Sequence, residues 1–211
     1  MKPVFVSLTH VADRQENLRK AFEFAAIDFS SFKNMGQAKN GKPFLALDRP
    51  HNVGYSLSHS QEIEVIALLD EEREIGIDLE AWPQRGADPV FLETVASAED
   101  ESVLRVLGEM GHDAGTALWV VKEAALKCTG EVMTDPRDLS VACVSKNIFR
   151  VRSSAMARSP HAEIDVSLHC LANENVLLLG VAMSAGALID GRKFRPVHVN
   201  ASGWNMVKFR R

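Results

Sequence analysis

The sequence has few of the residues that mark disulfide-linked, zinc-binding or membrane-spanning proteins. Its three cysteines, Cys128, Cys143 and Cys170, are widely spaced and form no C-x-x-C pair, so we expect reduced thiols. The seven histidines show no His-x-x-x-His spacing, which argues against a zinc hydrolase. The apolar run from Val4 to Leu8 is too short for a signal peptide or a membrane span. These absences predict a cytoplasmic protein with no membrane segment.

A large excess of charge of either sign is also absent. The net charge is −4 and the estimated pI is about 6.0, which gives no reason to expect bulk attraction to nucleic acid or to an anionic membrane. With 211 residues, of which 46% are hydrophobic, the chain can bury a full core in one large or two small domains. Residues 192–195 and 208–211 are basic, and we expect residues 186–211 to be a solvated tail, with a docking role as the alternative.

Hydrophobic periodicity divides the rest of the chain into two comparable halves, residues 1–72 and 73–185, and predicts an α+β fold. The charged segment 70–74 reads as the turn between them, and residues 30–49 read as a polar loop. The expected strands are residues 4–8, 53–57, 62–69, 75–80, 139–144, 148–152, 163–171 and 176–183. The expected helices are residues 13–27, 89–95, 98–107 and 115–128.

Two acids alternate with apolar residues in the segment from Gly76 to Glu80. Because a strand sends alternate side chains to the same face, Asp78 and Glu80 should point the same way. Two carboxylates that share a small space resist joint ionisation unless a cation compensates them, and an oxygen-only cluster suits Mg²⁺. Taken alone, the segment is typical of an ordinary strand with polar residues on its solvated face.

The segment from Trp119 to Lys127 reads as a helix that carries three residues on one stripe, Trp119, Glu123 and Lys127, at positions i, i+4 and i+8. Glu123 can supply the third oxygen ligand of the metal site, and Lys127 can supply an ammonium for a phosphate. Read on its own, this pair is a common surface ion pair that stabilises a helix. Trp119 is expected to pack in the core.

Upstream of these segments lie three groups that can donate to phosphate oxygens. Ser58 and His59 stand at the end of an expected strand, and Lys42 lies between a glycine and a proline, with its ammonium free to reach an anion. A turn with a half-buried histidine is the ordinary alternative for the first two residues.

In chain order these segments are Gly-Lys-Pro at residue 41, Ser-Leu-Ser-His-Ser at 56, Gly-Ile-Asp-Leu-Glu at 76 and Trp-x-x-Lys-Glu-Ala-x-x-Lys at 119. In this order and spacing, the chain resembles the 4′-phosphopantetheinyl transferase superfamily over residues 41–136. Its length fits the larger single-chain, surfactin-synthetase-activating type better than the short type, which assembles as a trimer. Two departures are Ser56, where the family usually has asparagine, and Val132, where it usually has a second glycine.

The resemblance implies two similar α/β halves related by a pseudo-twofold axis, with the active site in the cleft between them. It implies that the phosphopantetheine arm of coenzyme A is transferred to a serine of an apo acyl or peptidyl carrier protein, the reaction of a holo-acyl-carrier-protein synthase, with release of 3′,5′-ADP. A monomer is expected. The implied ligands of Mg²⁺, or of Mn²⁺, are Asp78, Glu80 and Glu123. The implied contacts to coenzyme A are Lys42, Ser58, His59, Lys122 and Lys127.

Within this resemblance, Glu123, Lys127 and His59 are the catalytic candidates. Glu123 is the favoured proton acceptor, although a carboxylate bound to a metal is a weak base. Two other functions remain open at this point. A protein of the same fold could bind coenzyme A or a carrier protein without catalysis, although all four residues Asp78, Glu80, Glu123 and Lys127 are present. A Mg²⁺-dependent phosphohydrolase would use the same oxygen ligands but would not need the Trp-x-x-Lys-Glu pattern.

Overall fold

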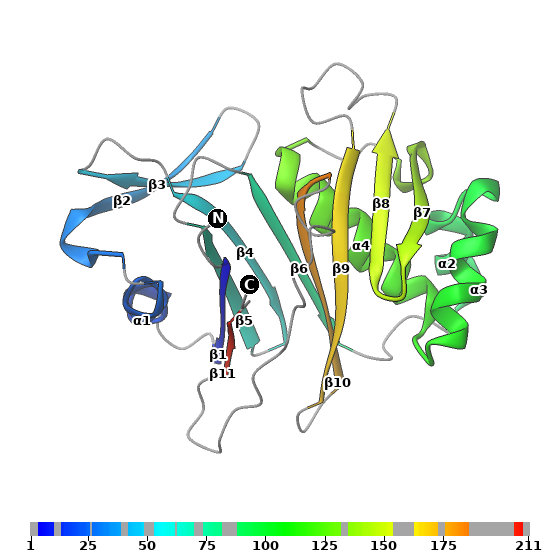
Figure 1. The fold of residues 1–211 in the computed structure, drawn as a ribbon, viewed down its shortest axis with the longest axis horizontal. Coiled ribbons are helices and arrows are strands. Elements are labelled where there is room, and N and C mark those ends of the chain that lie inside the picture. Colours follow the sequence, from blue (N-terminus) through cyan, green and yellow to red (C-terminus); the bar gives the residue numbers. More distant parts are fainter. Residues whose placement is uncertain are drawn as a thin grey trace.

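The described residues form three antiparallel sheets, and the two larger ones pack face to face with helices on their outer sides (Figure 1). A computed structural model describes residues 4–10, 14–25, 27–38, 42–48, 53–61, 63–69, 74–81, 88–131, 135–153, 163–172, 176–185 and 205–208. The expected boundaries of the halves, at residues 72/73 and 185/186, fall on or next to residues outside these ranges. Among the described residues, no helix combines the length and the apolar character needed to cross a lipid bilayer.

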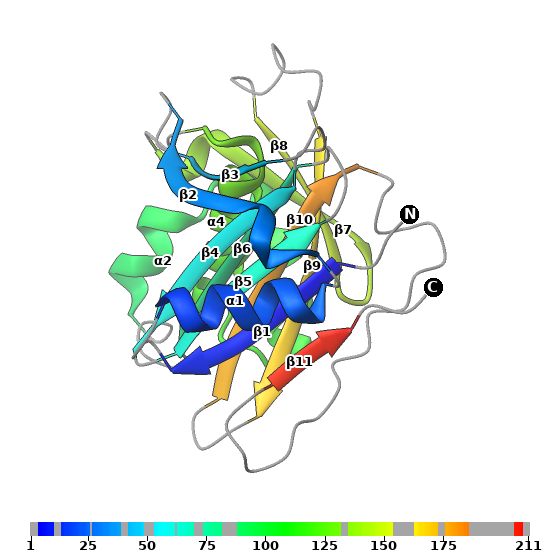
Figure 2. The same ribbon diagram turned by 90° about the vertical axis from the view of Figure 1, so that its left-hand side faces the viewer.

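The first half forms most of a four-stranded sheet in the order β11-β1-β5-β4, in which β11 (Asn205–Lys208) comes from outside that half. Helix α1 crosses its outer face, as the view from that side shows (Figure 2). The expected strands and helix are present with slightly different ends. The elements of this half are β1 (Val4–His10), α1 (Arg14–Phe24), η1 (Phe29–Ser31), β2 (Phe32–Gln37), β3 (Pro43–Leu47), β4 (Gly54–Ser60) and β5 (Ile63–Leu69).

The polar loop expected over residues 30–49 is wrong, because most of it forms the hairpin of β2 and β3. Gly36 lies opposite Phe44 in this hairpin, and the Phe44 ring occupies the space next to Gly36 that a side chain would take. Glycine in a strand often marks such a close approach, and here an aromatic ring covers the exposed backbone. The segment was expected to be a loop because of its glycine and polar residues, although its apolar residues have the spacing of strands.

The second half contains a five-stranded sheet in the order β6-β10-β9-β8-β7. All of its expected helices and strands are present. Ser97 and Asp100 form a reciprocal capping box at the start of the helical segment that begins at Ala98. The elements are β6 (Ile75–Ala81), α2 (Pro89–Val95), η2 (Ala98–Asp100), α3 (Glu101–Glu109), α4 (Ala114–Thr129), η3 (Pro136–Asp138), β7 (Leu139–Ser145), β8 (Ile148–Ser153), β9 (Glu163–Ala172) and β10 (Val176–Ser184).

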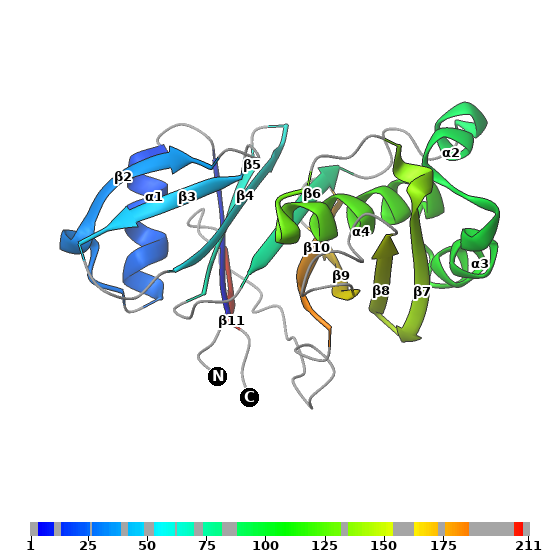
Figure 3. The ribbon, with the colours of Figure 1, turned by 90° about the horizontal axis from the view of Figure 1, so that it is seen from above.

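The two halves share one topology, which confirms the predicted α+β fold built from two similar units. In the first half, β1 pairs antiparallel with the last strand β5, which pairs with β4. In the second half, β6 likewise pairs antiparallel with the last strand β10, which pairs with β9. Seen from above, the layers follow one another as helix, sheet, sheet and helices (Figure 3).

Three hydrophobic clusters hold these layers together. The alternation of β5 shows how they divide: Ile66 and Leu68 pack beneath α1, whereas Val65, Ala67 and Leu69 face the second sheet. Between the sheets, β6 and β10 contribute a continuous set of aliphatic side chains, among them Ile77 and Leu179. The third cluster lies between α4 and the outer face of the second sheet. The joint between the halves is therefore itself a buried apolar core.

The expected solvated tail is also wrong in part. Asn205–Lys208 forms β11, which pairs antiparallel with β1 and extends the first sheet by one strand. A strand at the edge of a sheet presents unpaired backbone groups, and β11 pairs with those of β1 on this side. Residues 186–204 and 209–211 lie outside the described part of the chain.

Helix α4 lies directly on β6 and β10 because both strands carry a glycine beneath it. A Cβ atom at Gly76 would overlap the carbonyl oxygen of Ala124 and the backbone nitrogen of Cys128. At Gly180, a Cβ atom would lie 2.9 Å from Cγ1 of Val120. Only glycine permits this close approach of helix and strand backbones.

We therefore expect Gly76→Ala to destabilise the protein by about 3 kcal/mol or more, because the added methyl group meets backbone atoms that cannot rotate away. Chemical denaturation followed by circular dichroism would measure the loss. The control is Gly108→Ala in α3, where a Cβ atom would meet nothing within 4 Å. That variant should gain up to about 1 kcal/mol from helix propensity. Equal stability of the Gly76→Ala variant and the wild type would contradict the proposed packing of α4.

Candidate functional site

The two acids of β6 lie on the face that α4 covers. Asp78 is buried and Glu80 is half-buried, and both share this face with Gly76. Asp78 is paired in register with Gly180 of β10, so no side chain on that neighbouring position competes with it for the space under the helix. The alternation read from the sequence therefore places both carboxylates as expected.

Helix α4 brings an acid and a base to the same place. The helix begins at Asp113, whose side chain accepts from the backbone N–H of Thr116, and ends at Gly130, which has a left-handed φ of 74°. Within it, Glu123 and Lys127 stand one turn apart. The Lys127 ammonium lies 2.6 Å from Oδ1 of Asp78, forming an ion pair in which the carboxylate is almost fully buried.

The charges of Asp78, Glu80 and Lys127 all act on the carboxyl group of Glu123. Burial raises the pKa of Glu123, repulsion by Asp78 and Glu80 raises it further, and the Lys127 ammonium opposes both effects. A carboxyl group under these influences holds its proton more tightly than an exposed glutamate. A cation close to these carboxylates would relieve the repulsion.

Serine hydroxyls of β4 attach the first half to the free edge of β6. Ser56, Ser58 and Ser60 accept hydrogen bonds from the backbone N–H groups of the three β6 residues Ile77, Leu79 and Ala81, at 3.0, 3.2 and 3.1 Å. Since successive members are two residues apart on each strand, the contacts form a ladder made of side chains. Ser58 also bonds to Asp78 at 3.0 Å and to Lys127 at 3.1 Å.

A cavity of about 300 Å³ opens beside the Lys127 ammonium, between β3, β4 and the C-terminal half of α4. This is a size that can hold part of a small-molecule ligand. Lys42 lines it from the first half, and its ammonium donates to the carbonyl oxygen of Cys128 in the last turn of α4. Two lysines and two glutamates, Glu123 and Glu131, thus line a cavity between the halves. The full lining is Lys42, Pro43, Tyr55, Ser56, Leu57, Glu123, Leu126, Lys127, Gly130 and Glu131.

Comparison with protein-family models matches residues 74–177 to the model of the 4′-phosphopantetheinyl transferase superfamily. The match supports membership in that superfamily. The matched region covers just under half of the 211 residues and contains Asp78, Glu80, Glu123 and Lys127. A search of curated proteins finds no match.

Phosphopantetheinyl transferases use coenzyme A and a divalent cation, and the donor set of this chain fits such a cation. The three acids offer oxygen atoms only, as Mg²⁺ and Mn²⁺ prefer. Oδ2 of Asp78 is buried and has no hydrogen-bond partner among the described residues. Among the described residues, no group of three or more His, Cys, Asp or Glu side chains is placed so that it could hold a metal ion, and Lys127 supplies the positive charge next to Asp78. The three metal ligands therefore stay a prediction.

His59 lies apart from this cluster. Because Ser58 points towards β6, the next residue of the strand points to the opposite face, and the His59 side chain is exposed. His59 is not among the residues that line the cavity. Its expected contact with coenzyme A remains a prediction that the arrangement of the described residues does not support.

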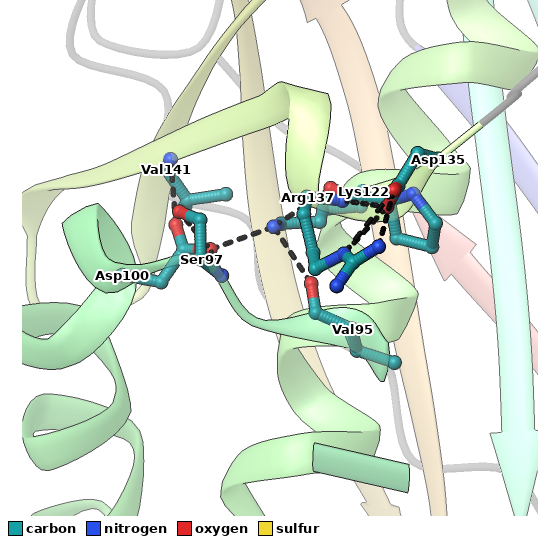
Figure 4. Close-up of polar contacts among 8 residues, drawn as sticks. Val95, Ser97, Asp100, Lys122, Asp135, Arg137 and Val141 are labelled. Carbon is teal, nitrogen blue, oxygen red and sulfur yellow. Dashed lines mark hydrogen bonds and ion pairs between the residues drawn. The ribbon is translucent and has the colours of Figure 1, made fainter. Parts of the chain in front are cut away.

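The structure corrects the expected role of Lys122. Its ammonium is fully buried and donates to Asp100 at 2.7 Å and to the carbonyl oxygens of Val95 and Pro136 at 2.9 and 3.0 Å (Figure 4). All three hydrogens are thus used inside the protein, which leaves none for a phosphate of coenzyme A. Burial lowers the pKa of Lys122, and the Asp100 carboxylate opposes that shift.

Asp100 is the residue of this region that the sequence analysis did not single out. Its carboxylate accepts from Lys122, from the backbone N–H of Val141 and from both the N–H and the hydroxyl of Ser97. It thus joins α4, β7 and the segment before α3. The Ser97-x-x-Asp100 capping box was a usable signal for its position, but not for its partner in α4.

We predict that Lys122→Met lowers stability by about 3–5 kcal/mol, because it leaves the Asp100 carboxylate buried without its cation. Chemical denaturation would measure this loss, and isothermal titration of the folded fraction should show unchanged affinity for coenzyme A. The matched control is Lys33→Met, which removes the exposed partner of Asp48 and should change stability little. A variant that stays stable but binds coenzyme A more weakly would restore the original expectation.

The raised pKa of Glu123 predicts how replacement of its carboxyl group changes the stability of the folded protein at different pH values. The folded state binds this proton more tightly than the unfolded chain does, so it gains stability below the ordinary pKa of 4.5 and loses that gain as pH rises through the folded pKa. In chelator-treated protein, Glu123→Gln should therefore raise the melting temperature by a few degrees at neutral pH. The increase should shrink as the pH falls towards 4.5.

Differential scanning fluorimetry across this pH range would measure the effect. Glu93→Gln, which changes an exposed glutamate of α2, serves as the control and should have little effect at any pH. A stability difference for Glu123→Gln that does not vary with pH would contradict the proposed crowding of the three acids.

Proposed function

We propose that the chain is a 4′-phosphopantetheinyl transferase of the larger single-chain type. It would transfer the phosphopantetheine arm of coenzyme A to a serine hydroxyl of an apo acyl or peptidyl carrier protein and release 3′,5′-ADP. The observation that carries this proposal is the meeting of Asp78, Glu123 and Lys127 beside a cavity to which Lys42 of the other half also contributes. The superfamily match supports the reaction class.

Charge is the main contribution that these residues would make. Phosphoryl transfer asks for little covalent participation by the protein, so positioned cations that meet the developing charge account for most of the catalysis. Lys127 at the cavity wall would donate to the diphosphate of coenzyme A, and Lys42 would hold the nucleotide end. A divalent cation held by Asp78, Glu80 and Glu123 would neutralise the diphosphate.

Glu123 is the acceptor that we propose for the proton of the attacking serine. The hydroxyl oxygen would bond to the phosphorus of the pantetheine phosphate, the bond from that phosphorus to the leaving 3′,5′-ADP would break, and the proton would pass to the Glu123 carboxylate. Burial and the neighbouring acids raise the proton affinity of Glu123, which favours this role. Binding of the cation would lower that affinity, so the two roles compete at this carboxylate.

The proposal extends to the state and the partners of the protein. Both halves of one chain line the cavity, which supports a monomer as the active unit. The free cysteines Cys128, Cys143 and Cys170 support a reducing compartment, and we propose a cytoplasmic enzyme. Coenzyme A and a carrier protein are the proposed partners, with no role for nucleic acid or membrane.

Transfer can be measured directly by incubating the protein with coenzyme A, Mg²⁺ and several purified apo carrier proteins. Intact-protein mass spectrometry should show the phosphopantetheine adduct on at least one carrier. We expect Asp78→Asn to reduce the rate at least a hundredfold, because it removes a charge that holds the cation. Lys42→Ala should mainly raise the KM for coenzyme A.

The exposed variant Glu93→Gln serves as the control and should behave like the wild type. If coenzyme A binds but no carrier receives an adduct, the protein is a non-catalytic binding protein of the same fold. If coenzyme A is cleaved and nothing is attached to the carrier, the site belongs to a phosphohydrolase. Either result would overturn the proposed transferase.

A further inference from the structure

The Ser58 hydroxyl reaches from the first half of the chain into the acidic cluster of the second. It lies 3.0 Å from Oδ1 of Asp78, 3.1 Å from the ammonium of Lys127 and 3.2 Å from the backbone nitrogen of Leu79. Ser58 is buried, and all three partners belong to the second half. A single side chain thus contacts both charged members of the Asp78–Lys127 ion pair.

The chemistry of these partners fixes the direction of each hydrogen bond. The ammonium of Lys127 and the N–H of Leu79 can only donate, so the Ser58 oxygen accepts from both. The ionised Asp78 carboxylate can only accept, so the single hydroxyl hydrogen of Ser58 goes to its Oδ1. A hydroxyl has one hydrogen and two lone pairs, and this arrangement uses all three. A contact from this hydroxyl to a phosphate would require Asp78 to lose its bond.

A comparison with the neighbouring serines shows that Ser58 does more than attach the two halves to each other. Ser56 and Ser60 accept from the β6 backbone in the same way, at 3.0 and 3.1 Å. In the described part of the chain, Ser58 is the one serine of the three that hydrogen-bonds to Asp78. The two flanking contacts join β4 to the backbone of β6, whereas the Ser58 hydroxyl also reaches the carboxylate of Asp78.

As a result, the two carboxylate oxygens of Asp78 have different surroundings. Ser58 and Lys127 both bind Oδ1, at 3.0 and 2.6 Å. Oδ2 is buried and has no hydrogen-bond partner among the described residues. With Oδ1 held at two points, the carboxylate cannot rotate freely, and Oδ2 is the oxygen that remains for a divalent cation. Mutation of a group that orients a metal ligand in this way typically weakens metal binding by roughly 10- to 100-fold.

We propose that Ser58 is a positioning residue that holds the Asp78 carboxylate and the Lys127 ammonium in place for the divalent cation and the diphosphate, and that its hydroxyl does not contact the nucleotide of coenzyme A. This inference deepens the proposed function and rests on it. It replaces the contact between Ser58 and coenzyme A that the family resemblance had implied. It also makes the geometry of the acidic site depend on the attachment of the two halves.

The first test measures Mn²⁺ binding without coenzyme A or carrier protein, by electron paramagnetic resonance of the free ion. Wild type, Ser58→Ala and Ser60→Ala are compared. Ser60→Ala is the matched control, because it removes the same kind of backbone contact without touching Asp78. We expect roughly 10- to 100-fold weaker binding for Ser58→Ala and little change for Ser60→Ala. Unchanged binding by Ser58→Ala, or an equal loss in both variants, would overturn the proposal.

The second test compares coenzyme A with dephospho-coenzyme A as substrates in the transfer assay. A positioning role predicts that Ser58→Ala lowers kcat for both substrates and leaves the ratio of their kcat/KM values unchanged. A contact with the 3′-phosphate would instead lower this ratio towards one and raise the KM for coenzyme A alone. That outcome would refute the positioning role and restore the nucleotide contact.

The two tests separate this inference from the proposed function. If the wild type transfers nothing to any carrier, the transferase proposal fails, while the Mn²⁺ comparison still decides whether Ser58 positions Asp78. Circular dichroism and thermal melting establish that each variant is folded. If Ser58→Ala does not fold, Ser58→Cys takes its place, because a thiol fills similar space but is a weak hydrogen-bond donor.

Discussion

The contact of α4 with two glycines of the second sheet is the constraint on which the rest of the site depends. Gly76 and Gly180 let the helix backbone approach β6 and β10 more closely than any side chain would permit. That approach brings Lys127 of the helix to 2.6 Å from Asp78 of the strand and places Glu123 in the field of both acids. If α4 lay farther from the sheet, Glu123 and Lys127 would not reach Asp78.

Contacts from both sides then fix α4 along and around its axis. The buried Lys122–Asp100 pair ties one side of the helix to the segment before α3 and to η3. Lys42 and Ser58 reach it from the first half of the chain, at the Cys128 carbonyl and the Lys127 ammonium. Neither half therefore contains the whole site. The apolar core between the sheets and the serine ladder at the edge of β6 together hold the two parts in register.

Much of the fold and of the candidate site could be predicted from the sequence, because hydrophobic periodicity shows which side chains share one face of a helix or strand. The alternation around Asp78 and the helical spacing of Glu123 and Lys127 placed these residues correctly, and every expected helix and strand is present.

Periodicity could not show which partner Lys122 would find, since Asp100 lies 22 residues away and the pairing depends on tertiary packing. It also could not reveal the ladder of Ser56, Ser58 and Ser60, which requires knowledge of how the halves meet. The hairpin of β2 and β3 was missed because Gly36 reads as a loop residue unless the ring of Phe44 above it is known.

The proposed site requires that oxygens of Asp78 and Glu123 bind the same divalent cation beneath α4. Anomalous diffraction at the manganese absorption edge, from crystals grown with Mn²⁺ and coenzyme A, tests this most directly. We expect one strong anomalous peak within coordination distance, about 2.0–2.6 Å, of Oδ2 of Asp78 and of a Glu123 carboxylate oxygen. A peak bound only elsewhere on the protein, or none here while coenzyme A occupies the cavity, would contradict it.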